Sequence, residues 1–191
     1  QTGAAISSVT LSDATPEIGD QITATINIDV SGVNSPDNLL GSYTGTLAWN
    51  AAVLAYDSHS GTPPSGFTGA VNTENVSTGL FTFNGANATG AKGNIIVLNI
   101  SFNVIGSGTS AIDLNYTAMA AAVTFQSLTG ILTVNDDEVS ATDMPSGIVI
   151  LDGSVSSDRT AEDVSSISIA HTTGTGPNRL MLVGVSWNCG T

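Results

Sequence analysis

Residues 21–30 read Gln21-Ile22-Thr23-Ala24-Thr25-Ile26-Asn27-Ile28-Asp29-Val30, and apolar and polar side chains alternate along the whole stretch. The isoleucines, Ala24 and Val30 therefore fall on one side of an extended chain, and the threonines, Asn27 and Asp29 fall on the other. A period of two residues is that of a β-strand, and β-branched side chains favour the extended backbone. The stretch predicts a strand with one buried face and one face in water.

The same alternation recurs on both sides of this stretch. In residues 43–49, Tyr43, Leu47 and Trp49 share one face, and in residues 95–104 the expected inward residues are Ile96, Leu98, Ile100, Phe102 and Val104. Shorter segments of the same type are residues 6–11, 53–56, 80–84, 112–116, 130–134 and 148–151. Residues 117–123 are rich in alanine, and we expect a loop turn or a bulged strand there. Many short strands separated by turns rich in glycine, proline and asparagine predict an all-β sandwich.

The composition and charge of the chain argue against two kinds of partner, nucleic acid and membranes. The chain has 191 residues, with 3 Lys and Arg against 16 Asp and Glu and a formal net charge of −13. Such a chain repels nucleic acid and anionic lipid, so neither is expected as a partner. No uninterrupted apolar run of about 18 residues is present, so no membrane insertion is expected. No basic and apolar leader opens the chain, so the protein either was never exported or has lost its signal. The start at Gln1 without a Met favours removal of a signal, and we expect a secreted or cell-surface protein.

The sequence predicts three parts. Residues 1–151 form the sandwich, residues 152–163 form a polar linker, and residues 164–191 form a short C-terminal β segment with two expected strands. Two strands alone bury too little apolar surface to be stable in water. The C-terminal segment therefore packs on the sandwich, completes a neighbouring molecule, or begins a second, incomplete domain.

Several motifs resemble a known family. They are Glu17-Ile18-Gly19-Asp20 leading into residues 21–30, the Gly41-Ser42-Tyr43 strand with its continuation to Asn50, and Phe81-Thr82-Phe83-Asn84-Gly85-Ala86 followed by the strand through Phe102-Asn103-Val104. Over residues 4–139 they resemble a cohesin domain. The resemblance implies a nine-stranded, jelly-roll-like sandwich outside the cell, used for adhesion or for docking a dockerin-bearing partner. Residues 171–187 separately resemble the first part of a β-sandwich module of bacterial surface proteins.

The cohesin resemblance also implies a partner face on three strands. Its outward residues are expected to be Thr44, Thr46, Ala48, Thr82, Asn84, Asp113 and Asn115, a small and mostly uncharged surface. The first hypothesis is therefore a noncatalytic structural or protein-binding module of a cell-surface or filamentous assembly, whose partner is a dockerin-like module or another copy of itself. In one variant the module assembles by strand addition. The added strand is then residues 4–11 or the C-terminal stretch containing Leu180, Leu182, Val183, Val185 and Trp187.

Two other function classes remain open. A carbohydrate-binding module of a secreted enzyme predicts a row of exposed aromatics, but most aromatics here fall at inward positions and only Tyr56, Phe67 and Trp187 do not. A hydrolase has least support, because the sequence has none of the common nucleophile, zinc or phosphate motifs. His59 and His171 are expected to be surface residues, and Cys189 is expected to be a buried small hydrophobe rather than an intermolecular thiol.

The sequence also offers candidate cofactor and modification sites. No cofactor is required, and Ca²⁺ is the best candidate, at residues 135–138 or in the loop 34–38, although solvated turns are the favoured interpretation of both. Candidate glycosylation sequons stand at Asn75, Asn87, Asn99 and Asn115, each with serine or threonine two positions later.

Overall fold

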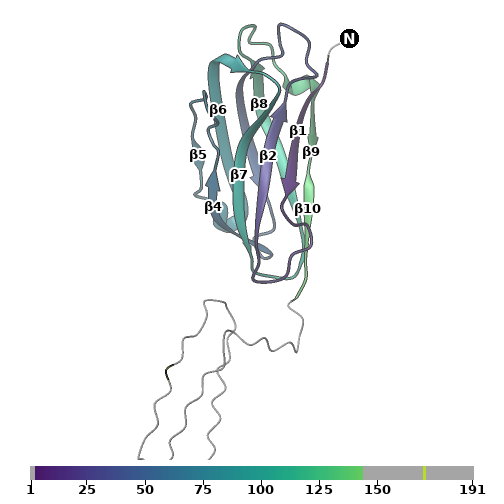
Figure 1. Cartoon of the computed structure of the whole chain (residues 1–191), viewed down its shortest axis with the longest axis vertical. Coiled ribbons are helices and arrows are strands. Elements are labelled where there is room, and N and C mark those ends of the chain that lie inside the picture. Colours follow the sequence, from purple (N-terminus) through teal and green to yellow (C-terminus); the bar gives the residue numbers. More distant parts are fainter. Residues whose placement is uncertain (1–2, 144–169, 171–191) are drawn as a thin grey trace, which may run out of the picture. The chain divides into compact units, whose positions relative to one another are not determined.

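The computed structural model describes residues 3–143 and residue 170. Residues 3–143 form two five-stranded sheets packed face to face (Figure 1). The first sheet has the order β4 (Leu54–Ser60), β7 (Asn94–Val104), β2 (Gln21–Asp29), β1 (Ala5–Leu11) and β9 (Leu132–Asn135). The second has the order β10 (Asp137–Ala141), β8 (Gly108–Ala121), β3 (Leu40–Ala48), β6 (Leu80–Ala91) and β5 (Val71–Asn72). The predicted all-β sandwich is therefore confirmed.

Two single-turn 3₁₀ helices, η1 (Val76–Thr78) and η2 (Thr129–Ile131), complete the described elements. Neither has the length or the apolar character that a membrane-crossing helix requires. The last expected strand, the linker and, apart from the single residue 170, the C-terminal β segment lie outside the described residues.

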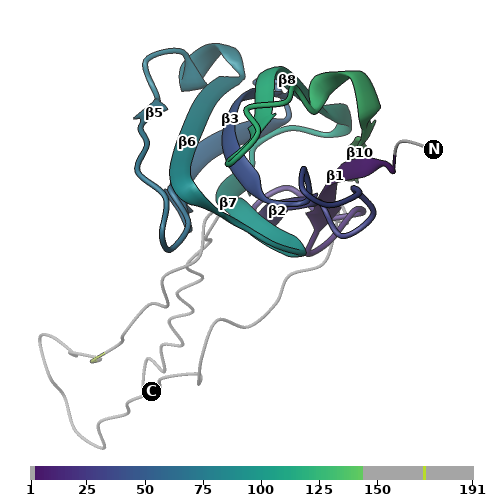
Figure 2. The ribbon, with the colours of Figure 1, turned by 90° about the horizontal axis from the view of Figure 1, so that it is seen from above.

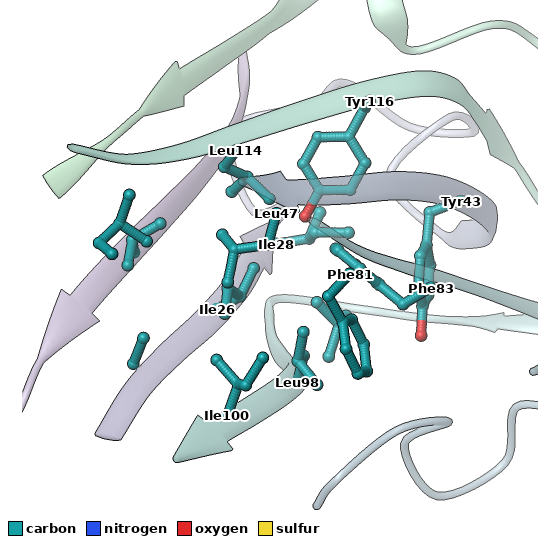
Figure 3. Close-up of a cluster of buried hydrophobic side chains, with 14 of the residues drawn as sticks. Ile26, Ile28, Tyr43, Leu47, Phe81, Phe83, Leu98, Ile100, Leu114 and Tyr116 are labelled. Atoms are coloured by element: carbon teal, nitrogen blue, oxygen red, sulfur yellow. The ribbon is translucent and has the colours of Figure 1, made fainter. Parts of the chain in front are cut away.

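The alternation of residues 21–30 sets the position of the core. Ile22, Ala24, Ile26 and Ile28 are all fully buried, while the residues between them are partly exposed. They face the inward aromatics of the second sheet, Tyr43, Phe81 and Phe83 among them (Figure 3). Seen from above, β6, β3 and β8 make one layer and β7, β2 and β1 make the other (Figure 2).

The expected inward position of Ile96 is wrong. Ile26 pairs with Leu98, but the next residue of β2, Asn27, pairs with Ile96, so Val97 is an extra residue in β7. Such a bulge reverses the side-chain phase beyond it. Val97 and Leu98 are consequently both buried, whereas Ile96 is 51% exposed.

A second bulge lengthens β8. Gly45 pairs with Tyr116 and Thr44 pairs with Ala118, which leaves Thr117 as the extra residue. The strand then continues to Ala121. The bulged strand, and not the loop turn, is therefore the correct interpretation of the start of residues 117–123.

The chain changes sheets at Asp136. Leu132–Asn135 pairs in parallel with β1 in the first sheet, and Asp137–Ala141 pairs antiparallel with β8 in the second. The carboxylate of Asp136 accepts a hydrogen bond from the backbone N–H of Leu114 at 2.8 Å, which holds the corner. Because the chain crosses here, one stretch of sequence is divided into β9 and β10. The described residues therefore contain ten strands where nine were expected, and one of the ten, β5, has only two residues.

The N-terminal strand pairs within its own chain. β1 lies between β2 and β9, so both of its edges are occupied. The expectation that residues 4–11 complete a neighbouring sheet is therefore wrong for this structure. The outer edge of β10 is also covered, since Ser140 and Thr142 donate backbone hydrogen bonds to Ala14 and Pro16.

Candidate functional site

The outer face of the second sheet is the candidate functional surface. Because Tyr43, Leu47 and Phe83 point into the core, their neighbours along β3 and β6 point outward. The seven predicted residues, Thr44, Thr46, Ala48, Thr82, Asn84, Asp113 and Asn115, all lie on this side of the sheet and are half-buried or exposed. We call these seven residues the β3/β6/β8 face.

Strand register brings the residues of this face into cross-strand rows. Thr46 is directly opposite Asn115 on β8 and Thr82 on β6. Ala48 is opposite Asp113, and Thr44 is opposite Asn84. Directly opposed side chains on one face have Cβ atoms about 5 Å apart. The face is therefore a continuous surface centred on Thr46, with threonines and asparagines and no charge in its middle.

Asn84 differs from the other six residues because its side chain holds a sheet edge. Its Oδ1 accepts a hydrogen bond from the backbone N–H of Ala70 at 3.1 Å, and its own N–H donates to the Ala70 carbonyl at 3.1 Å. Thr68 forms a further bridge with Ala86. The segment before β5 is thus fastened along β6, so the Asn84 amide already has a structural role.

Negative charge gathers on one side of the face. Asp113 is exposed on β8, and Glu138 is exposed on β10, where it is paired with Ala111. Exposed Asp136 lies at the corner next to Leu114. An uncharged centre with a carboxylate border favours a partner that places small side chains over Thr46 and basic side chains over the border.

The candidate calcium loops do not gather ligands. Within residues 3–143 and residue 170, no group of three or more His, Cys, Asp or Glu side chains is placed to hold a metal ion. In residues 135–138, Asp136 Oδ1 accepts from Leu114 N–H and Asp137 Oδ1 accepts from Glu138 N–H. In the loop 34–38, Asp37 Oδ1 accepts from the Thr124 hydroxyl.

The four sequons differ in how their amides are used. Asn75 and Asn115 are exposed, at the N-cap of η1 and on the β3/β6/β8 face. Asn99 accepts a hydrogen bond from the Thr25 hydroxyl at 2.8 Å, and Asn87 Oδ1 accepts three, one from the Thr89 hydroxyl and two from backbone N–H groups. Glycosylation of any of the four stays a prediction.

His59 lies in a structural contact. Its Nδ1 is 2.6 Å from the Tyr56 hydroxyl, and its ring packs edge-on against Phe81 with a centroid distance of 5.2 Å.

A hollow of about 300 Å³ lies beside the start of β4. The hollow is lined by Ala51, Leu54, Ala55, Tyr56, Val76, Ser77 and Ile105, with no carboxylate among them. His171 and Cys189 lie outside the described residues.

The aromatic side chains do not form a sugar-binding row in residues 3–143. Phe67 is only 7% exposed because the loop that carries it folds over Tyr43, at a centroid distance of 5.7 Å. Tyr56 is half-buried. Sequence reasoning missed Phe125, which is 82% exposed, because it follows no alternating pattern that signals an outward position. Trp187 and the other C-terminal candidates, Leu180, Leu182, Val183 and Val185, are outside the described residues.

Comparison with solved structures identifies the fold. A non-cellulosomal cohesin from Archaeoglobus fulgidus is 14% identical with a TM-score of 0.55, covering 71% of this chain and 91% of the cohesin. A cohesin module of a family 33 glycoside hydrolase from Clostridium perfringens is 12% identical with a TM-score of 0.57, covering 75% and 100%. A type I cohesin–dockerin complex from Clostridium thermocellum matches with 12% identity and a TM-score of 0.55, covering 72% and 99%.

No family model and no curated protein matches the sequence. The described part of the chain is therefore a β-sandwich with the cohesin fold, as the sequence motifs predicted.

Proposed function

We propose that residues 3–143 form a noncatalytic module that binds a protein partner through the β3/β6/β8 face. The observation that carries this proposal is the row of Asn115, Thr46 and Thr82 across three strands, small and uncharged on an otherwise acidic chain. A surface of small, uncharged side chains contacts another protein closely while desolvating few charges.

The partner that fits best is a dockerin-type module. Cohesins with this fold include one solved with its dockerin from Clostridium thermocellum, and another from Acetivibrio cellulolyticus in complex with a Cel5 dockerin. The border formed by Asp113 and Glu138 favours basic side chains on the partner. The role proposed for the whole chain is that of a secreted or cell-surface component, the location that the resemblance to cohesins implies.

Binding by the full chain to a panel of purified dockerin modules tests this proposal. Thr46→Arg places a bulky charge at the centre of the face, where a partner would have to bury it, and should weaken binding by at least about a hundredfold. Thr23→Arg is the matched control, because Thr23 is an outward threonine on β2, the middle strand of the other sheet. Equal loss in both variants, or unchanged binding in Thr46→Arg, contradicts the assignment of this face.

The carbohydrate-binding alternative is tested in the same format. Soluble cello-, xylo- and manno-oligosaccharides are titrated into the full chain by calorimetry. Binding that survives Thr46→Arg would favour a glycan site elsewhere on the molecule.

A further inference from the structure

Phe125 forms an apolar tip at one end of the sandwich. It is 82% exposed, and Val123, two residues before it, is 62% exposed. Both lie in the segment that follows β8, at the end that is uppermost in Figure 1. A large aromatic side chain exposed to this extent costs solubility and adds nothing to the core.

The loop holds Phe125 outward in a fixed conformation. Its backbone has φ 57°, in the left-handed region, which is the only positive φ of a non-glycine residue among the described residues. The Thr124 hydroxyl donates to Asp37, and Ala121 N–H donates to the Gln126 carbonyl at 2.9 Å, so the loop is tied on both sides of Phe125. A phenylalanine in this conformation costs about 1–2 kcal/mol relative to ordinary backbone geometry. Such local strain typically occurs at functional sites.

The opposite end of the sandwich carries a complementary feature. The hollow of about 300 Å³ is lined mainly by apolar side chains, and Ile105 at its border is 53% exposed. This volume is at the lower limit for small-ligand sites, about 300–1,000 Å³, so it suits one or two apolar side chains. β8 begins three residues after Ile105 and ends two residues before Val123, so the tip and the hollow lie at the two ends of one strand.

Charge also distinguishes the two ends. Lys92, the only lysine or arginine among the described residues, is exposed close to the tip, in the loop whose Gly90 approaches Ala122. The tip end also carries Asp29, at the end of β2, and Asp37, which accepts the Thr124 hydrogen bond. The end with the hollow carries Glu17, Asp20 and Asp143 and no lysine or arginine among the described residues, and Glu74 lies two residues before Val76. Contact between unlike ends therefore places Lys92 opposite carboxylates, whereas contact between two hollow ends opposes only acid with acid.

We propose that Phe125 of one copy inserts into the hollow beside Ile105 of a second copy, so that chains associate head to tail. The two contacting surfaces are different, so the contact does not close into a two-fold dimer and repeats along a line. The β3/β6/β8 face takes no part in this contact and stays free for a partner on every copy. The head-to-tail contact therefore does not depend on the proposed partner binding. If both occur, each copy in the linear array presents one free β3/β6/β8 face.

The contact is expected to be weak, because a single tip buries far less than the 1,200–2,000 Å² of a stable interface. Sedimentation and small-angle scattering of the full chain over a concentration series up to about millimolar should show elongated oligomers that grow with concentration. Phe125→Ser and Ile105→Ser should each lower the association constant about ten- to a hundredfold. Ile96→Ser is the matched control, since it removes a comparably exposed isoleucine from the outer face of the first sheet and should leave association unchanged.

Mixing the two variants gives a sharper test. Phe125→Ser keeps its hollow and Ile105→Ser keeps its tip, so an equimolar mixture should form dimers and nothing longer. A wild-type chain that stays monomeric throughout the series overturns the proposal. Association that persists in both variants, including association through residues 144–191, also overturns it, as does a mixture that forms long oligomers. Melting curves matched to the wild type establish that each variant is folded.

Discussion

The hydroxyl of Ser7 on β1 lies 2.9 Å from the hydroxyl of Tyr116 on β8, joining the two sheets across the core. Ser7 also donates to the Asn27 carbonyl at 2.6 Å, so Tyr116 is the donor to Ser7. Ser7 is fully buried and Tyr116 is 9% exposed. Among the apolar contacts of the core, this pair is a polar link that requires both sheets in their correct relative positions.

Removing this link should destabilise the sandwich moderately. Tyr116→Phe and Ser7→Ala should each lower the free energy of unfolding by about 1 kcal/mol, the usual net contribution of one hydrogen bond. Their combination should cost less than the sum, because both substitutions remove the same bond. Urea unfolding of the two single variants and the double variant measures this coupling. Strict additivity would show that the bond contributes nothing.

Alkaline pH should destabilise the protein through its buried tyrosines. Burial raises the pKa of Tyr116 above its ordinary value, and burial raises the pKa of Tyr43 to about 12. The nearby Thr62 hydroxyl offsets part of the rise in the pKa of Tyr43. The hydroxyls of Tyr43 and Thr62 are both buried, and neither has a hydrogen-bond partner of good geometry. In the unfolded chain both groups ionise near pH 10. Above that pH the unfolded state therefore binds fewer protons than the folded state, and stability falls as pH rises.

The measurement for this prediction is the free energy of unfolding between pH 8 and 11.5. The two tyrosines should have little effect on this free energy below about pH 10 and should make it fall above that pH. The fall should be shallower in the Tyr116→Phe variant than in the wild type. An equal decline in the variant and the wild type would show that Tyr116 does not contribute.

Gly85 is expected to tolerate no side chain. A Cβ atom there would lie 2.5 Å from the Tyr43 hydroxyl and 2.6 Å from the ring carbon that bears it. Tyr43 is fully buried and packed against Phe67 and Phe83, so it cannot move aside freely. Gly85→Ala should lower stability by about 1–3 kcal/mol. Gly130→Ala is the control, because a Cβ there meets nothing within 4 Å, and its melting temperature should stay near that of the wild type.

The bulge in β7 predicts opposite effects for two adjacent residues. Val97→Thr places a hydroxyl at a fully buried position and should cost about 1–3 kcal/mol. Ile96→Thr changes a half-exposed side chain and should stay within about 0.5 kcal/mol of the wild type. Thermal melts of both variants suffice. An uninterrupted alternation would give the reverse order, so the comparison tests the bulge directly.

Asp136 should act as a corner residue and not as a calcium ligand. Asp136→Ala removes the acceptor of the Leu114 N–H and should cost about 1 kcal/mol, whereas Asp136→Asn keeps a side-chain acceptor and should cost less. The loss on Asp136→Ala should be the same in calcium and in EDTA, as followed by calorimetry. A loss seen only in calcium would restore the metal interpretation of residues 135–138.

Alternation along the chain determined the sandwich and much of its core. In residues 21–30 and 43–49 every expected inward residue is buried, because a strand's side chains alternate regardless of what lies beyond it. The same argument placed Thr44, Thr46 and Ala48 outward, and strand register in the structure assembled them with Thr82 and Asn115. The motifs shared with cohesins pointed to the same fold.

Only the tertiary structure decided the rest. Val97 and Thr117 are bulge residues because of the register with a partner strand, which the local sequence does not contain. Phe67 is buried because a loop covers Tyr43, and the chain crosses between sheets at Asp136 because Leu114 offers it an N–H. Phe125 is exposed because its loop is tied to Asp37, 88 residues earlier in the chain. The sequence pattern alone shows the two-residue period of a strand. Strand register, the burial of a side chain under a loop and the exposure of a side chain at the end of the sandwich depend on contacts between residues that are distant in the sequence.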